Sequence, residues 1–278
     1  MSITLENIKN AVTDKTVGIT LVHVLGFNAV NDELVEFCKE KDLFFIEDCC
    51  EAHGATYNGE KVGNFGDVSN FSFYFGHHIT SVEGGMVCTN DDELYNYAKL
   101  FRSHGMVREA SKETQDKFKE SHPGCNPLFT FAVPGYNLRN QEFNAVLGLS
   151  QLPRLQNNVE VRFENLEIWL DTLDSDIFFT EFERKGNSNF ALPLILIKKD
   201  LEYFQKVCKL LLKSGVEYRV GTAGGGNQSR QPYLEKYDYI THDLNNVNHI
   251  HDYGLYIGNH PELDKRQIID LCRKLNEL

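Results

Sequence analysis

The order of apolar and polar stretches along the chain predicts an α/β protein. Residues 17–24 (VGITLVHV) and 43–47 (LFFIE) are apolar runs typical of strands buried on both faces. Between them, Asn31 and Asp32 can cap an amphipathic helix over residues 33–41. Because a strand, a helix and a strand at this spacing form a βαβ unit, the sheet is expected to be mainly parallel.

The rest of the chain continues this pattern and then restarts it near residue 189. Pro153 is expected to kink or separate two helices, and residues 107–127 are polar and loop-like. We therefore predict a large domain over residues 1–157 and a smaller C-terminal α/β domain over residues 158–278. The other expected elements are strands at 71–74, 85–89, 190–197 and 216–220, and helices at 91–105, 140–155, 160–173, 200–213 and 263–278.

Composition narrows the classes of protein that remain. The net charge is −12 over 278 residues, which disfavours a broad nucleic-acid surface but leaves room for an anionic small substrate. Seven cysteines without a C-x-x-C pair argue against a disulfide framework and against a thiolate zinc site. The sequence shows neither a membrane-spanning apolar run nor a secretory signal, so we expect a cytoplasmic protein without a membrane partner.

Asp48 is the first candidate for chemistry, because it follows directly after a predicted buried strand. In an open α/β sheet, ligands bind outside the carboxyl ends of the strands. An acid at this place can hold a protonated ring nitrogen, a metal ion, or nothing more than a turn. Asp48 alone does not separate these alternatives.

Four ordered blocks give the chain a family resemblance. They are EDCCEAHGA at 47–55, FGD at 65–67, SFYFGHHITSVEGG at 72–85 and GYNLR at 135–139. Together they resemble the sugar aminotransferase family (DegT/DnrJ/EryC1/StrS) of fold-type I PLP enzymes. The resemblance implies a PLP-dependent transferase fold like that of aspartate aminotransferase, with an incomplete large domain here and a smaller C-terminal domain.

His77 stands where this family carries the lysine that binds PLP covalently, and no lysine lies between Lys61 and Lys99. Histidine cannot form that covalent link, but it can move a proton because its unperturbed pKa is about 6.5. The His77–His78 pair resembles the branch of PMP-dependent sugar 3-dehydratases. That branch implies loss of the C3 hydroxyl from a nucleotide-linked 4-keto-6-deoxy sugar, GDP-4-keto-6-deoxy-D-mannose above all, with His77 as the base.

A sister group with the same histidine pair holds an iron–sulfur cluster on closely spaced cysteines. Between the histidine pair and the GYNLR block this chain has only Cys88 and Cys125, whereas such a cluster needs four thiolates. The resemblance therefore implies the self-contained reaction, in which glutamate regenerates PMP.

The family motifs assign further roles by position. Asp48 would hold the pyridinium nitrogen, Glu51 would lie near the ring hydroxyl and Ser72 would contact the cofactor phosphate. Asn137 would reach that phosphate across a homodimer interface. The candidates for substrate binding are His78, Arg139, Arg219 and Arg230, since arginine recognises phosphate with two parallel hydrogen bonds. The alternatives are a turn residue for Asp48, a solvated acid for Glu51 and surface charges for the arginines; we expect no metal site.

Family members begin with a long stretch before the first strand predicted here. In the family, that stretch supplies a phosphate-binding helix start and an aromatic residue that stacks on the cofactor ring, and neither is recognisable in this sequence. Three explanations stay open: an expressed fragment, a split gene with a complementing N-terminal polypeptide, or a decayed reading frame. The competing functions are accordingly an ordinary nucleotide-sugar aminotransferase and a truncated, inactive family member.

Overall fold

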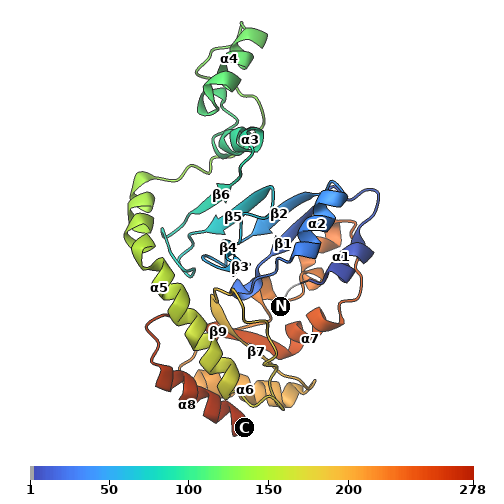
Figure 1. Cartoon of the computed structure of the whole chain (residues 1–278), viewed down its shortest axis with the longest axis vertical. Helices are drawn as coiled ribbons and strands as arrows, with labels where there is room; N and C mark the ends of the chain where they lie inside the picture. The colour runs from blue at the N-terminus through green and yellow to red at the C-terminus, as the bar shows by residue number, and fades with distance from the viewer. Residues whose placement is uncertain (1–2) are drawn as a thin grey trace.

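Two sheets organise the chain in the computed structural model, which describes residues 3–278 (Figure 1). The first sheet contains β1 (Gly18–Val22), β2 (Phe44–Asp48), β5 (Val68–Ser72) and β6 (Gly85–Cys88), in that order. β1, β2 and β5 are parallel, and β6 runs antiparallel to β5. This confirms the predicted βαβ unit and the mainly parallel sheet.

Helices α1 (Leu5–Ala11) and α2 (Asp32–Glu40) pack against this sheet. The Asn31 side chain accepts a hydrogen bond from the N–H of Leu34 and so begins α2 as predicted. The prediction that the first strand is buried on both faces was wrong, because β1 is the edge strand of the described sheet and its Val22 is 41% exposed. The core residues of this layer are Ile8, Leu21, Ala29, Val30, Leu34, Phe37, Cys38, Leu43 and Phe45.

A small hairpin and a helical extension follow β2 and β6. The strands β3 (Thr56–Tyr57) and β4 (Glu60–Lys61) are joined by Asn58 and Gly59, whose positive φ angles of 49° and 85° suit a two-residue turn. Beyond β6, the elements α3 (Asp92–Arg102), η2 (Val107–Glu109) and α4 (Lys112–Ser121) project away from the sheets (Figure 1).

The prediction of a loop over residues 107–127 was wrong, because α4 lies within it. No residue of α4 is buried, so the helix has no core-facing apolar stripe by which the sequence could reveal it. Local interactions stabilise it instead. The Ser111 side chain accepts from the N–H of Thr114 at its start, and Lys112 and Lys117 form i,i+4 ion pairs with Asp116 and Glu113.

The helix α5 (Glu142–Thr172) crosses from the first sheet to the second (Figure 1). We expected Pro153 to kink or separate two helices here, but the structure has one 31-residue helix with Pro153 inside it. Burial of Leu166, Trp169 and Leu170 in the second core holds the C-terminal half in place and offsets the cost of the proline. The domain boundary at 157/158 stays a prediction, and it falls within this helix.

The second sheet has the order β7 (Ala191–Ile195), β9 (Gly254–Gly258), β8 (Tyr218–Val220) and is antiparallel. Its core includes Phe178, Leu192, Leu211, Leu255 and Leu275. The sequence patterns predicted β7, β8 and two of the surrounding helices but missed β9 and α7. The surrounding elements are α6 (Leu201–Lys213), α7 (Asn245–Tyr253), α8 (Lys265–Asn276) and the short η3 (Ala223–Gly225), η4 (Gln228–Arg230) and η5 (Pro232–Lys236).

The two sheets meet at η1 (Val24–Gly26), directly after β1. Gly26 has a φ of 84°, and a Cβ there would collide with the Ser188 carbonyl, so only glycine fits. The N–H of Ser188 donates to the Gly26 carbonyl at 2.9 Å. This close approach brings the carboxyl end of the first sheet beside β7. In residues 3–278, no helix is long and apolar enough to span a membrane.

Candidate active site

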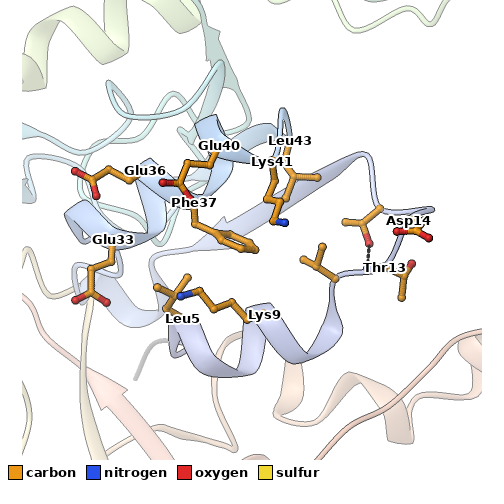
Figure 2. Close-up of a pocket in the computed structure, with 12 residues that line it drawn as sticks. Leu5, Lys9, Thr13, Asp14, Glu33, Glu36, Phe37, Glu40, Lys41 and Leu43 are labelled. Carbon is orange, nitrogen blue, oxygen red and sulfur yellow. Dashed lines mark hydrogen bonds between the residues drawn. The ribbon is translucent and has the colours of Figure 1, made fainter.

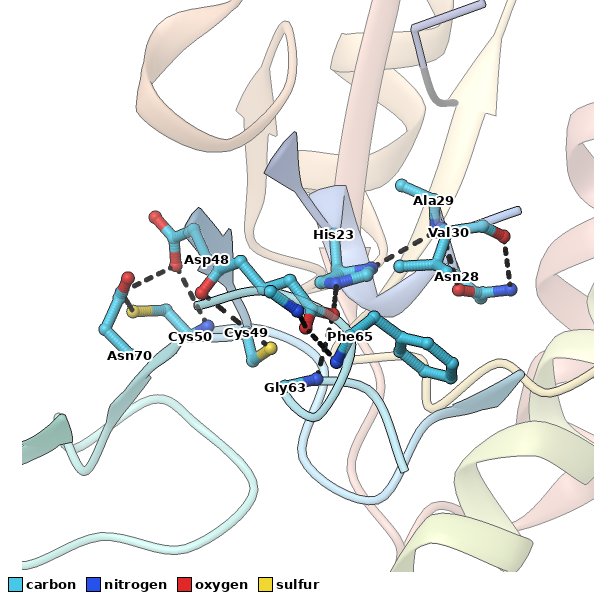
Figure 3. A network of polar contacts seen from close by, with 12 residues as sticks. His23, Asn28, Ala29, Val30, Asp48, Cys49, Cys50, Gly63, Phe65 and Asn70 are labelled. Atoms are coloured by element: carbon cyan, nitrogen blue, oxygen red, sulfur yellow. Dashed lines mark hydrogen bonds and ion pairs between the residues drawn. The ribbon is translucent and has the colours of Figure 1, made fainter. Parts of the chain in front are cut away.

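The carboxyl ends of β2 and β5 place Asp48 and Ser72 at the same edge of the first sheet, since Asp48 pairs with Asn70 in register. One carboxylate oxygen of Asp48, Oδ1, accepts from the N–H of Cys50 at 3.1 Å and from the Asn70 side chain at 3.0 Å (Figure 3). Within residues 3–278, Oδ2 has no hydrogen-bond donor. Asp48 is therefore held in a fixed orientation with one oxygen left for a ligand.

His77 lies in the segment after β5, half-buried, with its ring edge-on to Phe190 at 5.2 Å and to Tyr74 at 5.9 Å. Its Nδ1 is buried without a hydrogen-bond partner in the described part of the chain. Burial lowers the pKa of His77, while the Ser72 carbonyl and the Asp48 charge act to raise it. The imidazole is thus neutral near pH 7 and can accept a proton. The structure brings together His77, Asp48 and Ser72, as the motif spacing implied.

His78 points the other way, into the protein. It is 5% exposed, and its Nε2 lies 3.1 Å from the carbonyl and 3.0 Å from the hydroxyl of Ser188. Burial holds the pKa of His78 well below its ordinary value. Its role in substrate binding stays a prediction. The contacts of its Nε2 with Ser188 tie the His77 segment to the C-terminal half of the chain.

The backbone of η1, where the two sheets meet, holds the Glu51 side chain. Its carboxylate accepts from the N–H of Leu25 at 2.7 Å, and Leu25 has a positive φ of 54°. Burial raises the pKa of Glu51 to about 7; the Leu25 hydrogen bond lowers it and the Asp48 charge raises it further. Near neutral pH this carboxyl is therefore about half protonated, and it can donate or accept a hydrogen bond.

The raised pKa of Glu51 predicts a pH-dependent stability. Its folded pKa lies above the unfolded value of about 4.3, so the folded state binds more protons and this contribution is lost as the pH rises from about 4.5 to 7. Across that pH range the wild type should lose about 2 kcal/mol of its free energy of unfolding through this group, and Glu51→Gln should not show this loss. Urea unfolding at pH 5 and pH 7.5 measures it, with the exposed Glu60→Gln as the control. Equal pH slopes for Glu51→Gln and the wild type would contradict the assignment.

A cavity of about 600 Å³ is lined by Gly76, the residue before His77, and otherwise by residues of the C-terminal half. Gly76 and Phe190 line it, together with Arg219 from β8 and Tyr256 from β9, whose ring lies 6.3 Å from that of Phe190. The sequence predicted Arg219 as a site residue but not Phe190, because nothing in the spacing of Phe190 relates it to residues 48–77. The full lining is Gly76, Arg162, Phe190, Ala191, Leu212, Glu217, Tyr218, Arg219, Tyr256, Gly258, Asn259 and His260.

Three predicted residues lie apart from this constellation. Asn137 and Arg139 are exposed in the segment before α5, where the Arg139 Nε donates to the Asn137 side-chain oxygen at 3.3 Å. Arg230 forms two hydrogen bonds with the Asp252 carboxylate, at 2.6 and 3.1 Å, so its guanidinium is already paired. Their roles toward a cofactor or a substrate stay predictions.

A buried cluster of His23, Glu47 and Cys49 has side chains of the metal-binding type within the described residues (Figure 3). Glu47 accepts from His23 Nε2 at 3.2 Å and from the N–H groups of Gly63, Phe65 and Gly66 at 2.8–2.9 Å. Burial raises the pKa of Glu47, but these hydrogen bonds outweigh it and hold the pKa below its ordinary value.

The other members of this cluster are also engaged. His23 Nδ1 accepts from the N–H of Ala29 at 3.1 Å, so the ring proton lies on Nε2 and faces Glu47. Burial raises the pKa of the Cys49 thiol well above its ordinary range, which keeps it protonated. Since Glu47 and His23 Nδ1 already accept hydrogen bonds and the Cys49 thiol keeps its proton, we interpret the cluster as a structural network.

A larger cavity of about 830 Å³ lies between α1 and α2 (Figure 2). Leu5 and Phe37 form its floor, Lys9 lies over the Phe37 ring at 5.7 Å, and Glu33, Glu36 and Glu40 lie along its rim. It contains none of the predicted site residues. Leu43, just before β2, places it near the amino ends of the strands, opposite to where α/β sheets bind ligands.

The residues at the strand ends fit PLP or PMP. A carboxylate fixed at Oδ1 with Oδ2 free suits a protonated pyridine nitrogen, and the Ser72 hydroxyl suits a phosphate. The buried, unpaired Nδ1 of His77 supplies a proton acceptor in place of a lysine. The described residues thus fit a cofactor that is bound without a covalent link.

Comparison with known proteins supports this fit. GDP-4-keto-6-deoxy-D-mannose 3-dehydratase of Yersinia pseudotuberculosis is 32% identical over the whole of this chain, which covers 69% of that protein. GDP-perosamine synthase of Escherichia coli O157:H7 is 30% identical over 98% of this chain and 68% of its own length. A solved structure of the E. coli 3-dehydratase with bound hydrated PLP superposes with a TM-score of 0.87 at 32% identity, covering 99% of this chain and 71% of that one.

These similarities confirm the predicted PLP-dependent transferase fold and the use of PLP or PMP by relatives of this kind. The model of the DegT/DnrJ/EryC1/StrS aminotransferase family matches residues 1–276. The chain therefore belongs to the DegT/DnrJ/EryC1/StrS aminotransferase family.

Proposed function

We propose that this chain acts as a PMP-dependent 3-dehydratase that removes the C3 hydroxyl of a GDP-linked 4-keto-6-deoxy sugar. The observation that supports this most is His77: a neutral, half-buried imidazole near Asp48, in a segment without a lysine. An aminotransferase needs a lysine there to hold PLP, whereas a dehydratase needs a group that moves a proton.

PMP would supply the amine that reacts with the sugar ketone and a ring that accepts electrons. In this proposal Asp48 keeps the ring nitrogen protonated through its free Oδ2, and the Ser72 hydroxyl donates to the phosphate. With the cofactor bound, His77 would take a proton from the C4′ carbon of the cofactor and would deliver one to the departing C3 hydroxyl of the sugar. Phe190 and Tyr74 hold the His77 ring edge-on.

The relatives support the substrate and the amino donor in this proposal. Solved 3-dehydratase structures that resemble this chain hold, by their descriptions, a trapped PLP–glutamate geminal diamine and GDP-perosamine. We accordingly propose glutamate as the amino donor and GDP as the nucleotide. We also propose a cytoplasmic homodimer in which Asn137 and Arg139 act on the site of the second copy, since both are exposed in the segment before α5.

The test supplies the purified chain with PMP, glutamate and GDP-4-keto-6-deoxy-D-mannose and identifies the product by mass spectrometry. The proposal expects a 3-deoxy keto sugar. Formation of a 4-amino sugar instead would assign the chain to the aminotransferases, a class that the GDP-perosamine synthase relatives represent. A folded chain that binds no PMP, alone or with a polypeptide covering the N-terminal part of a relative, would identify an inactive family member.

A further inference from the structure

Ser188 is a fully buried residue at which three separate parts of the chain meet. Its N–H donates to the Gly26 carbonyl at 2.9 Å, and its hydroxyl donates to the His53 carbonyl at 2.5 Å. Nε2 of His78 lies 3.0 Å from that hydroxyl and 3.1 Å from the Ser188 carbonyl. Ser188 thus joins η1 to the segments that carry His53 and His78.

These contacts fix the protonation state of His78. The hydroxyl proton of Ser188 is used on the His53 carbonyl, and a carbonyl oxygen can only accept, so the proton between Ser188 and His78 belongs to Nε2. Nδ1 then carries a lone pair, and it is buried without a hydrogen-bond partner among the described residues. Burial is the largest cause of the low pKa of this ring, and the positive charges that Arg162, His53 and His77 carry when protonated lower it further. Near neutral pH, His78 is therefore a neutral donor tied to Ser188.

The same stretch of chain also contacts His77. Phe190 follows Ser188 by two positions, and its ring lies edge-on to that of His77 at 5.2 Å. The N–H groups of Ser188 and Phe190 both donate to carbonyls of η1, which holds this stretch in place. Because His77 and His78 share a peptide bond, fixing the His78 ring restricts the backbone from which the His77 side chain projects.

We propose that His78 and Ser188 are positioning residues, whose hydrogen bonds form a buried latch that holds the His77 imidazole beside the cofactor. The reaction at His77 rests on the proposed function, whereas the latch rests on the contacts of Ser188. A displacement of about 1 Å at a reacting group costs up to about 100-fold in rate. The latch therefore acts on the rate of proton transfer and not on the affinity for the substrate.

The position of residue 77 can be measured without turnover in His77→Lys protein, in which a lysine beside the cofactor binds PLP covalently. Adding His78→Asn, whose shorter amide does not reach the Nε2 position, should slow formation of the visible-absorbing adduct about 10-fold or more. Adding His78→Gln, whose amide can donate from the Nε2 position, should restore the rate to within about 3-fold. Ser188→Ala should slow the adduct as well, and Ser175→Ala, on an exposed serine, is its matched control and should not.

Turnover separates this role from substrate binding. In protein that keeps His77, His78→Asn and Ser188→Ala should each lower kcat about 10-fold, while KM for GDP-4-keto-6-deoxy-D-mannose and the Kd of PMP stay near the wild-type values. A raised KM with an unchanged kcat would make His78 a substrate contact and would overturn the latch. Equal adduct rates in folded His77→Lys protein, with and without these changes, would overturn it as well.

Ser188→Ala keeps the carbonyl that His78 contacts, so it stays informative if His78→Asn does not fold. The latch and the proposed function fail in different ways. If His77→Lys binds PLP covalently at a rate that depends on His78, but the wild type forms no 3-deoxy sugar, the proposed function fails and the latch stands. If folded His77→Lys forms no adduct, residue 77 lies away from the cofactor and both are overturned.

Discussion

Replacing His77 with asparagine is expected to reduce the dehydration rate about 100-fold or more, while PMP still binds. Asparagine keeps a polar side chain against Phe190 and Tyr74 but cannot take up a proton. The measurements are the initial rate of 3-deoxy sugar formation and the Kd of PMP from the change in its absorbance or fluorescence. His122→Asn, on an exposed histidine after α4, is the control and should keep the wild-type rate.

Placing a lysine at position 77 tests whether this residue lies next to the cofactor. His77→Lys is expected to bind PLP covalently, with a visible absorbance that survives dialysis and is fixed by borohydride reduction. Full dehydration activity in His77→Asn would assign the proton transfer to another group. A folded His77→Lys protein that binds PLP without a covalent link would place residue 77 away from the cofactor.

Replacing Glu47 with glutamine is expected to lower the free energy of unfolding by about 3–5 kcal/mol. Glu47 is fully buried, and both of its oxygens accept hydrogen bonds, from three backbone N–H groups and from His23. An amide presents an NH₂ group to some of these donors and leaves them without an acceptor. Urea unfolding measures the loss. The dependence of the unfolding free energy on urea concentration should stay unchanged, so that the two proteins can be compared.

Glu40→Gln, on an exposed acid at the end of α2, is the control for that experiment and should change stability little. The Glu47 effect should also depend on pH with a defined sign. Because its folded pKa is lowered, its stabilisation is present above the unfolded value of about 4.3 and is lost as the pH falls through the folded pKa. A loss below about 1 kcal/mol at pH 7 would mean that water replaces the missing acceptor.

The effects of Glu47 and Glu51 on stability run in opposite directions with pH, although the two residues lie only four positions apart. Both are buried, but Glu47 receives four hydrogen bonds and Glu51 receives one from the N–H of Leu25. Hydrogen bonding to the charged form lowers a pKa, and burial without enough donors raises it. The motif that contains both acids does not distinguish them, because the donors come from residues 23–25 and 63–66.

The sequence by itself determined the βαβ order, the strand-end position of Asp48, the family and the substitution at His77. These depend on apolar periodicity, caps and ordered motifs, all of which act over a few residues or are read directly from the chain. Tertiary structure decided that α5 continues through Pro153, that His78 hydrogen-bonds to Ser188, that Phe190 packs against His77, and that Tyr256 and Arg162 line the same cavity as Gly76. Those contacts join residues about 80 to 180 positions apart, so they depend on how the second sheet packs against the strand ends of the first, and no local pattern encodes that packing.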